Sequence, residues 1–295
     1  SVLNPEPDYD LGEGDELIIL RRQNQVPELL PDQEGVAVEQ TRALSLERPN
    51  LTEALVIVSN QNLALIIGEL LKHAAAELRV VVACRDSLNE ERSFHQRFTS
   101  SKSDRLSVEF VEFDLAESSS LEGLVPEQFD VIFVSADESE AFIDADSRTM
   151  LVLFLLQEIK VKRRTNLFPP VVAELLDSES RDLCQETPMT DAVVSTELLS
   201  IQLAQLVRDP YLETLYNELL NAGGIEIGIR EATHYVELNQ SVELGAVTQK
   251  ALEFNEIVLG FWKSTGQITL SPDKRLSEEF VAGDRIIVLA QQVYL

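Results

Sequence analysis

The sequence predicts an α/β fold: a doubly wound, mostly parallel Rossmann-like sheet followed by a smaller C-terminal α+β domain. Short aliphatic runs alternate with helical segments from residue 51 to about residue 210, which is the pattern of βαβ units and a parallel sheet. Pro210 and an Asn-Ala-Gly-Gly stop at 221–224 then interrupt this rhythm. Beyond the stop the chain changes to short, hairpin-like strands, so the two parts differ in architecture.

The strands expected in the first domain are short and rich in Val, Ile and Phe, as buried parallel strands are. They cover residues 54–58, 78–83, 108–113, 129–134, 171–174 and 192–195. Helices are expected over 63–75, 89–98 and 147–160, around Arg181, and over 197–207. The span 51–200 has the length and rhythm of a Rossmann unit, and we assign residues 51–210 to this domain.

The second domain is expected over residues 211–295. A helix at 212–220 precedes strands at 225–229, 233–237, 257–261, 267–270 and 284–289, with a second helix at 244–252. Residues 23–50 are rich in Pro and Gln and are interpreted as a linker.

Two segments near the ends of the chain have similar sequences, and we call this similarity the internal echo. Leu-Asn-Pro at 3–5 and Leu-Gly-Glu-Gly-Asp-Glu-Leu-Ile-Ile-Leu at 11–20 match Leu-Ser-Pro at 270–272 and Phe-Val-Ala-Gly-Asp-Arg-Ile-Ile-Val-Leu at 280–289. Gly-Asp favours a tight turn and the aliphatic run a buried strand. A chance match of two short strands is the alternative, which the shared Leu-x-Pro disfavours. If the two segments are copies of one repeat, residues 1–22 are the terminal hairpin of a preceding repeat.

The charge of the chain restricts its partners. Asp and Glu number 51 against 24 Lys and Arg, for a net charge of -27. Such a chain is repelled by nucleic acid and by anionic lipid headgroups, so no nucleic-acid partner is expected. The acidity suits cations, basic partners or adaptation to a salty cytoplasm. Cys84 and Cys184 form no metal or redox motif, which favours a reducing compartment.

The residues predict neither a dinucleotide site nor a catalytic one. The first turn of the Rossmann-like domain, Ser-Asn-Gln-Asn at 59–62, has no glycine, and Gly68 lies deep in the following helix. Without such glycines the backbone cannot approach a pyrophosphate closely, so no NAD is expected. His73, His95 and His234 belong to no nucleophile motif, and the chain is therefore not expected to be an enzyme.

Carboxylates follow nearly every expected strand of the first domain. The densest groups are Asp137, Glu138 and Glu140 after the fourth strand, and Glu174 with Asp177 after the fifth. Ligands of doubly wound sheets bind at the carboxyl ends of the strands, and calcium prefers several oxygen ligands. We therefore interpret these five side chains as a calcium site. The alternative is that they cap helix N-termini and lie in solvent.

Four segments resemble a known family. Residues 129–139 (Phe-Asp-Val-Ile-Phe-Val-Ser-Ala-Asp-Glu-Ser) and 144–148 (Asp-Ala-Asp-Ser-Arg) resemble the fourth strand and following helix of RCK (regulator of K+ conductance, TrkA-like) domains. Residues 171–183, with Leu-Asp-Ser-Glu-Ser-Arg, and 191–200 resemble the CASTOR/POLLUX ion channels more specifically. The similarity extends along the chain and is weakest over 23–60.

The resemblance implies a cytoplasmic, ligand-sensing gating-ring module of a cation channel. In this family two RCK units lie in tandem behind an upstream transmembrane pore, which agrees with the echo. It also implies dimers, a tetrameric ring, and calcium binding coupled to pore opening at the cytoplasmic face of a membrane. Two alternatives remain: a stand-alone ligand-binding or scaffold protein with a degenerate Rossmann fold, and an NAD- or S-adenosylmethionine-dependent enzyme.

Overall fold

The computed structural model describes Gly12 and residues 51–291, apart from gaps at 58–59, 61, 75, 99–102, 116–117, 138–140, 165–167, 186–189, 210 and 221–224. The predicted hairpin at 1–22, except Gly12, and the predicted linker at 23–50 lie outside the described residues. The chain divides into two compact units, one from Glu47 to Leu212 and one that contains Glu213–Leu295. Each is described by itself.

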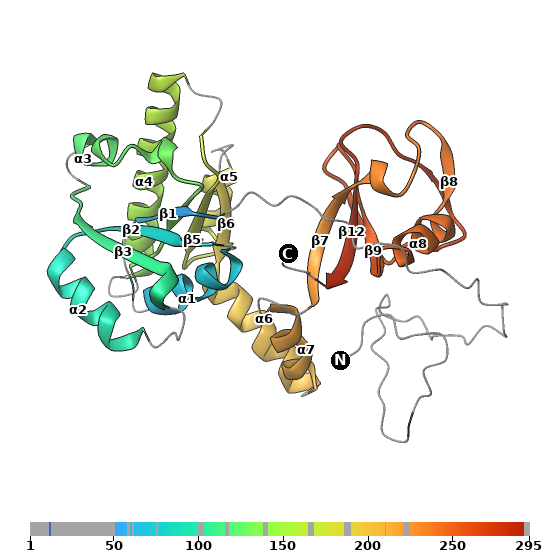
Figure 1. Cartoon of the computed structure of the whole chain (residues 1–295), viewed down its shortest axis with the longest axis horizontal. Helices are drawn as coiled ribbons and strands as arrows, with labels where there is room; N and C mark the ends of the chain where they lie inside the picture. The colour runs from blue at the N-terminus through green and yellow to red at the C-terminus, as the bar shows by residue number, and fades with distance from the viewer. Residues whose placement is uncertain are drawn as a thin grey trace. The chain divides into compact units, whose positions relative to one another are not determined.

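A six-stranded parallel sheet forms the centre of the first unit (Figure 1). Its strands are β1 (Glu53–Ile57), β2 (Leu78–Cys84), β3 (Leu106–Glu112), β4 (Val131–Val134), β5 (Val171–Leu175) and β6 (Thr190–Val194). They lie in the order β3-β2-β1-β4-β5-β6, and every pairing is parallel. The chain thus builds outward from β1 to one edge and returns to build the other half from β4. This confirms the predicted doubly wound sheet.

Helices cover both faces of this sheet, which explains why its inner strands are apolar on both sides. These helices are α1 (Leu63–His73), α2 (Ser87–Arg97), α3 (Ser118–Gly123), α4 (Phe142–Arg163) and α5 (Ser180–Gln185). Helix α6 (Ser195–Arg208) follows β6 and has no buried side chain. Along β1, Leu55 and Ile57 join the core cluster that contains α4, whereas Ala54 and Val56 join the cluster that contains α1. The alternation of side chains along a strand sends successive residues into the two cores.

Helix α4 is longer than its apolar run predicted. It starts at Phe142 rather than near 147 and ends at Arg163 rather than 160. The added residues contribute Asp144 and Asp146 at the start and Lys162 and Arg163 at the end, which suits the helix dipole. One stripe that includes Val152, Leu156 and Ile159 is buried. No helix in the described part of the chain has both the length and the apolar character needed to cross a membrane.

The second unit is the smaller α+β lobe that the sequence predicted. Its elements are α7 (Leu212–Leu220), β7 (Ile225–Glu231), β8 (Ser241–Glu243), α8 (Leu244–Leu252), β9 (Glu256–Trp262), β10 (Ile268–Leu270), β11 (Ser277–Glu279) and β12 (Arg285–Gln291). An antiparallel sheet has the order β10-β9-β12-β7, and β11 pairs with β8. Helix α8 packs against the sheet through Leu244, Val247 and Ala251.

The prediction of a strand at 233–237 was wrong. The chain forms a 3-10 turn at Ala232–His234 there, and the side chains of Ala232 and Tyr235 are both buried in the lobe core. The Tyr235 hydroxyl donates a hydrogen bond to buried Glu256. Burial of these anchors, three residues apart, needs a turn rather than a strand, in which such residues would face opposite sides.

Candidate functional site

The candidate site lies at the carboxyl ends of the strands in the first unit, where the sheet order reverses between β1 and β4. Asn60, just after β1, bridges this point. Its side-chain amide donates to the Ala136 carbonyl at 3.2 Å and to Glu174 Oε2 at 3.1 Å. Its Oδ1 accepts from the Asn62 N–H at 2.8 Å, at the start of α1. One side chain therefore links the ends of β1, β4 and β5.

Glu174 is the centre of these contacts. Besides the bond from Asn60, its Oε2 accepts bonds from the Ser135 hydroxyl at 3.3 Å and from the Ala136 N–H at 3.2 Å. β4 pairs directly with β5, so the carboxylate of one strand reaches the end of the next. Glu174 therefore contacts the residue that directly precedes Asp137.

The five residues predicted to bind calcium have different places in the structure. Asp137 is partly buried, directly after β4, whereas Glu138 and Glu140 lie outside the described residues. Asp177 accepts a bond from the Glu179 N–H at 3.0 Å, within its own turn. Within the described ranges, no three His, Cys, Asp or Glu side chains form a group that could hold a metal ion. The five-residue site stays a prediction.

Asp146 is a functional candidate that the sequence reasoning missed. It lies on α4 and is only 2% exposed. Its Oδ1 accepts from the Leu176 N–H at 2.8 Å, and its Oδ2 accepts from the Asp177 N–H at 3.0 Å. The helical spacing of the sequence does indicate that Asp146 is buried, because this carboxylate falls on the same helix stripe as buried Thr149 and Leu153. A buried carboxylate needs partners, and backbone N–H groups supply them here.

The same loop is held from its other side by the start of α6. The Thr196 hydroxyl donates to the Leu176 carbonyl at 2.6 Å, and Arg181 forms an ion pair with Glu197 at 2.7 Å. The loop after β5 is thus fixed through its N–H groups by α4 and through a carbonyl by α6. The three sequence segments at 144–148, 171–183 and 191–200 therefore meet at this loop.

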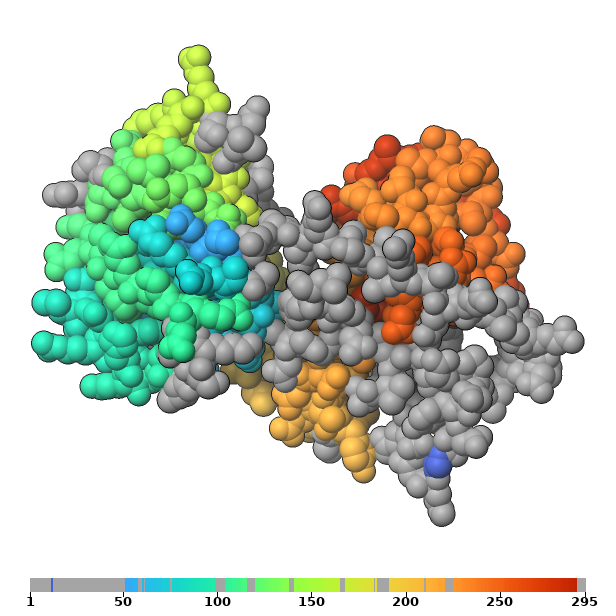
Figure 2. Space-filling model, in the orientation of Figure 1, coloured from blue at the N-terminus to red at the C-terminus, as the bar shows by residue number. Residues whose placement is uncertain are grey.

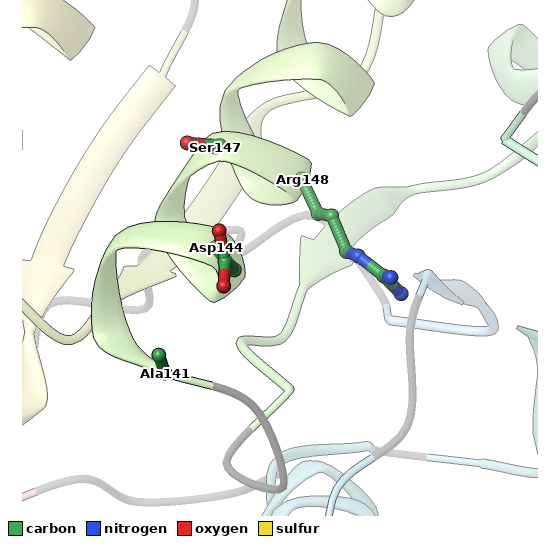
Figure 3. A pocket seen from close by; sticks show the side chains of 4 residues that line it. All are labelled: Ala141, Asp144, Ser147 and Arg148. Atoms are coloured by element: carbon green, nitrogen blue, oxygen red, sulfur yellow. The ribbon is translucent and has the colours of Figure 1, made fainter.

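A shallow cavity of about 450 Å³ lies beside the first turns of α4. Figure 3 shows the four residues that line it, Ala141, Asp144, Ser147 and Arg148, with the Asp144 and Arg148 side chains diverging. The Ser147 hydroxyl donates to the Ile143 carbonyl at 2.6 Å. Because α4 follows β4, this cavity belongs to the same end of the sheet as Glu174.

Both thiols of the first unit are buried and are held protonated. Burial raises the pKa of Cys84 to about 12, and the carboxylates of Glu90, Asp86 and Glu112 add to the increase. Burial also raises the pKa of Cys184, with a further contribution from Asp146. Thiolate is the reactive form, so neither cysteine is suited to nucleophilic chemistry.

A comparison with solved structures defines the class of fold. The gating ring of human SLO3 superimposes with a TM-score of 0.57 and 10% sequence identity, over 84% of this chain and 49% of that one. At this identity the likeness concerns the fold alone, which is that of a channel gating-ring domain. No protein-family model matches the chain.

Sequence comparison then gives the relatives. A protein of Arabidopsis thaliana named "Probable ion channel POLLUX" is 24% identical over an alignment that covers 98% of this chain and 39% of the relative. Ion channel CASTOR of Lotus japonicus is 27% identical over 48% of this chain and 20% of the relative. The homologues of this chain are CASTOR and POLLUX ion channels, and the predicted resemblance is confirmed. The chain spans less than half the length of these relatives.

Proposed function

We propose that this chain is a ligand-sensing regulatory module of a cation channel and acts at the cytoplasmic face of a membrane. The observation that carries the proposal is the similarity to POLLUX along 98% of the chain, joined to a gating-ring fold in the first and second units. The pore would lie in the part of the protein that precedes this chain.

The ligand that we propose is a cation, with calcium first. Asp137, Glu138, Glu140, Glu174 and Asp177 would supply the oxygens, and calcium takes about six to eight of them in irregular geometry. The hydrogen bond from the Ala136 N–H to Glu174 supports this set, because Ala136 directly precedes Asp137 in the chain. A bound cation would also reduce the repulsion that crowded carboxylates impose on one another.

We propose further that the crevice does not bind a dinucleotide and that the module acts without catalysis. The Asn60 side chain is bonded to Ala136 and Glu174 across the point where a pyrophosphate would approach the sheet. The Glu174 carboxylate, which accepts a hydrogen bond from Asn60, would repel phosphate. Titration calorimetry with NAD and with S-adenosylmethionine tests this, and micromolar binding of either would support the enzyme alternative.

Assembly into dimers and a tetrameric ring of tandem units is part of the proposal. Two helices support it: α6 has no buried side chain and exposes Leu199, Leu203 and Val207, and α4 exposes Phe154 and Val161. Apolar faces of this kind are typical of interaction surfaces. The ligand would act by binding one shape of the assembly more tightly than the other.

The first experiment is thermal unfolding of the chain with calcium. Millimolar CaCl2 should raise the melting temperature more than NaCl of the same ionic strength, because a specific ligand stabilises the folded state by mass action. Asp137→Asn with Glu174→Gln should reduce this difference. An equal shift with both salts would mean that the acids form only a salt-adapted surface.

The matched control is Glu91→Gln with Asp104→Asn. Both residues are exposed in the same unit, and Asp104 precedes β3, at the opposite end of the sheet from the carboxyl ends of the strands. This control removes the same number of charges and should keep the full calcium response. Current recordings from the full-length channel with and without calcium, for wild type and both variants, then test the coupling to the pore.

A further inference from the structure

The four-stranded sheet of the second unit has two faces with different environments. On β12, Ile286, Val288 and Ala290 belong to the core cluster formed with α8. The alternate residues, Ile287 and Leu289, pair with Ile229 and Ile227 of β7. Paired residues of antiparallel strands point to the same face, so these four side chains lie on the face opposite α8.

The same register extends this face across all four strands. Trp262 of β9 pairs with Arg285 and with Ile268 of β10, and Leu289 pairs with Ile257. The apolar residues of the outer face are Ile225, Ile227, Ile229, Ile257, Trp262, Ile268, Leu270, Ile287 and Leu289. Ile227 is 58% exposed, Ile268 53% and Leu270 56%. We call these nine residues the outer sheet face.

The outer sheet face is nearly free of net charge. The charged side chains that the strand register places there are Glu231 and Arg285, which form an ion pair at 3.6 Å. The Arg285 guanidinium also lies 5.8 Å from the centre of the Trp262 ring. The other charged side chains of β7 and β9 are Glu226, Arg230 and Glu256, and the register places them on the opposite face, the one that packs on α8. Arg230 and Glu256 pair with each other at 3.0 Å, and Glu256 is buried. In a chain of net charge -27, such a surface is unusual.

We propose that the outer sheet face is a contact surface between two copies of this lobe. Two chains of the same large negative charge repel each other, so they can approach closely only through surfaces with little charge. A flat, aliphatic sheet face can pack on its own copy in the manner of a β-sandwich, at about 10 Å between sheets. The contact would be isologous, with each copy offering the same residues.

The charge of the chain argues against other occupants. A basic protein would be drawn to the acidic surfaces rather than to this neutral one, and an anionic membrane would repel the chain as a whole. The proposal does not depend on the ligand or on the channel, because it concerns only how this lobe associates. A failed calcium test would leave it unaffected.

Sedimentation equilibrium of the 295-residue chain tests the contact. Because screening weakens the long-range repulsion and leaves apolar contact intact, the dissociation constant should fall when NaCl rises from 0.05 to 0.5 M. Ile227→Lys with Ile229→Lys should raise it by about 30-fold or more, as expected when two well-packed contact residues are lost. Circular dichroism melts should stay close to wild type, since both side chains are largely exposed.

The matched control is Leu65→Lys on α1 with Leu88→Lys on α2, which adds the same charge at exposed apolar residues of the first unit. Hydrogen exchange locates the contact directly, because the amides of β7 and β10 should become better protected as concentration rises. The uncharged pair Ile227→Thr and Ile229→Thr repeats the test if the lysine variant unfolds. Concentration-independent exchange in β7 and β10, or a monomer at millimolar concentration in 0.5 M NaCl, would overturn the proposal.

Discussion

Asp146 is the single carboxylate on which the candidate site most depends, because it holds the backbone N–H groups of Leu176 and Asp177. Asp146→Asn should therefore destabilise the first unit by about 2 kcal/mol, since an amide cannot accept both bonds and one buried group loses its partner. Urea unfolding followed by circular dichroism measures this loss.

Asp144→Asn is the control for this change. Asp144 lies on the same helix and lines the cavity of Figure 3, but it is exposed. Its replacement should leave the urea midpoint within about 0.5 kcal/mol of wild type. Equal losses in the two variants would assign the effect to the helix dipole rather than to the loop.

Gly260 is a residue of the second unit where the backbone leaves a side chain no room. A Cβ atom there would lie 2.1 Å from the Thr269 carbonyl oxygen on β10, beside an irregularity in the pairing of β9 with β12. Gly260→Ala should cost at least about 2 kcal/mol, because backbone rather than a flexible side chain must move. Gly68→Ala, where no atom lies within 4 Å, should instead stabilise α1 by about 0.5–1 kcal/mol.

The sequence predicts the positions of some residues of the candidate site but not their side-chain contacts. The strand ends that carry Asp137 and Glu174 followed from the alternation of strands and helices. The roles of Asp146 and Asn60 did not, because each depends on a contact with residues at least 30 positions away. A local pattern assigns a residue to a helix or a turn, but the partner of its side chain is set by the packing of the elements.

At the scale of elements, the turn before β12 depends on buried Asp284. Its carboxylate accepts from the N–H groups of Ser264 at 2.8 Å and Val281 at 3.0 Å, and it lies 3.3 Å from the Lys263 ammonium. Burial alone would raise the pKa of Asp284, but these hydrogen bonds outweigh burial and lower it below the ordinary value. The turn therefore joins β9 to β12 through an ionised carboxylate.

This lowered pKa predicts how acid affects the lobe. A carboxylate with a depressed folded-state pKa contributes stability above its unfolded pKa of about 4, and that contribution is lost as the pH falls through the folded pKa. The free energy of unfolding of the second unit, measured with denaturant, should thus decrease below about pH 4. Asp284→Asn should be less stable than wild type at pH 7 and should lose less on acidification. Parallel pH profiles for the two proteins would contradict this role.

Two of the strands that the sequence failed to predict have too few residues to carry a pattern. Strands β8 and β11 have three residues each, which is shorter than one clear alternation of apolar and polar side chains. The turn at 232–234 was mistaken for a strand because Thr233, Tyr235 and Val236 favour strands locally. The burial of Ala232 and Tyr235 in one core decided the outcome.

For the whole molecule, the two compact units predict two unfolding transitions rather than one. Asp146→Asn should shift only the transition of the first unit, and Gly260→Ala only that of the second. Differential scanning calorimetry resolves the two when their midpoints differ. A single transition that both variants shift equally would mean that the units unfold as one cooperative body.

The strand order also has a consequence for the time at which the first unit can fold during synthesis. β1 lies between β2 and β4, and Ala54 pairs with Val131, 77 positions later in the sequence. Pairings of such large separation slow folding. The ribosome must therefore complete β4 before β1 gains its second neighbour, and until then one edge of β1 stays open to pairing with other chains. During this interval the acidic side chains around the nascent sheet would keep neighbouring chains apart.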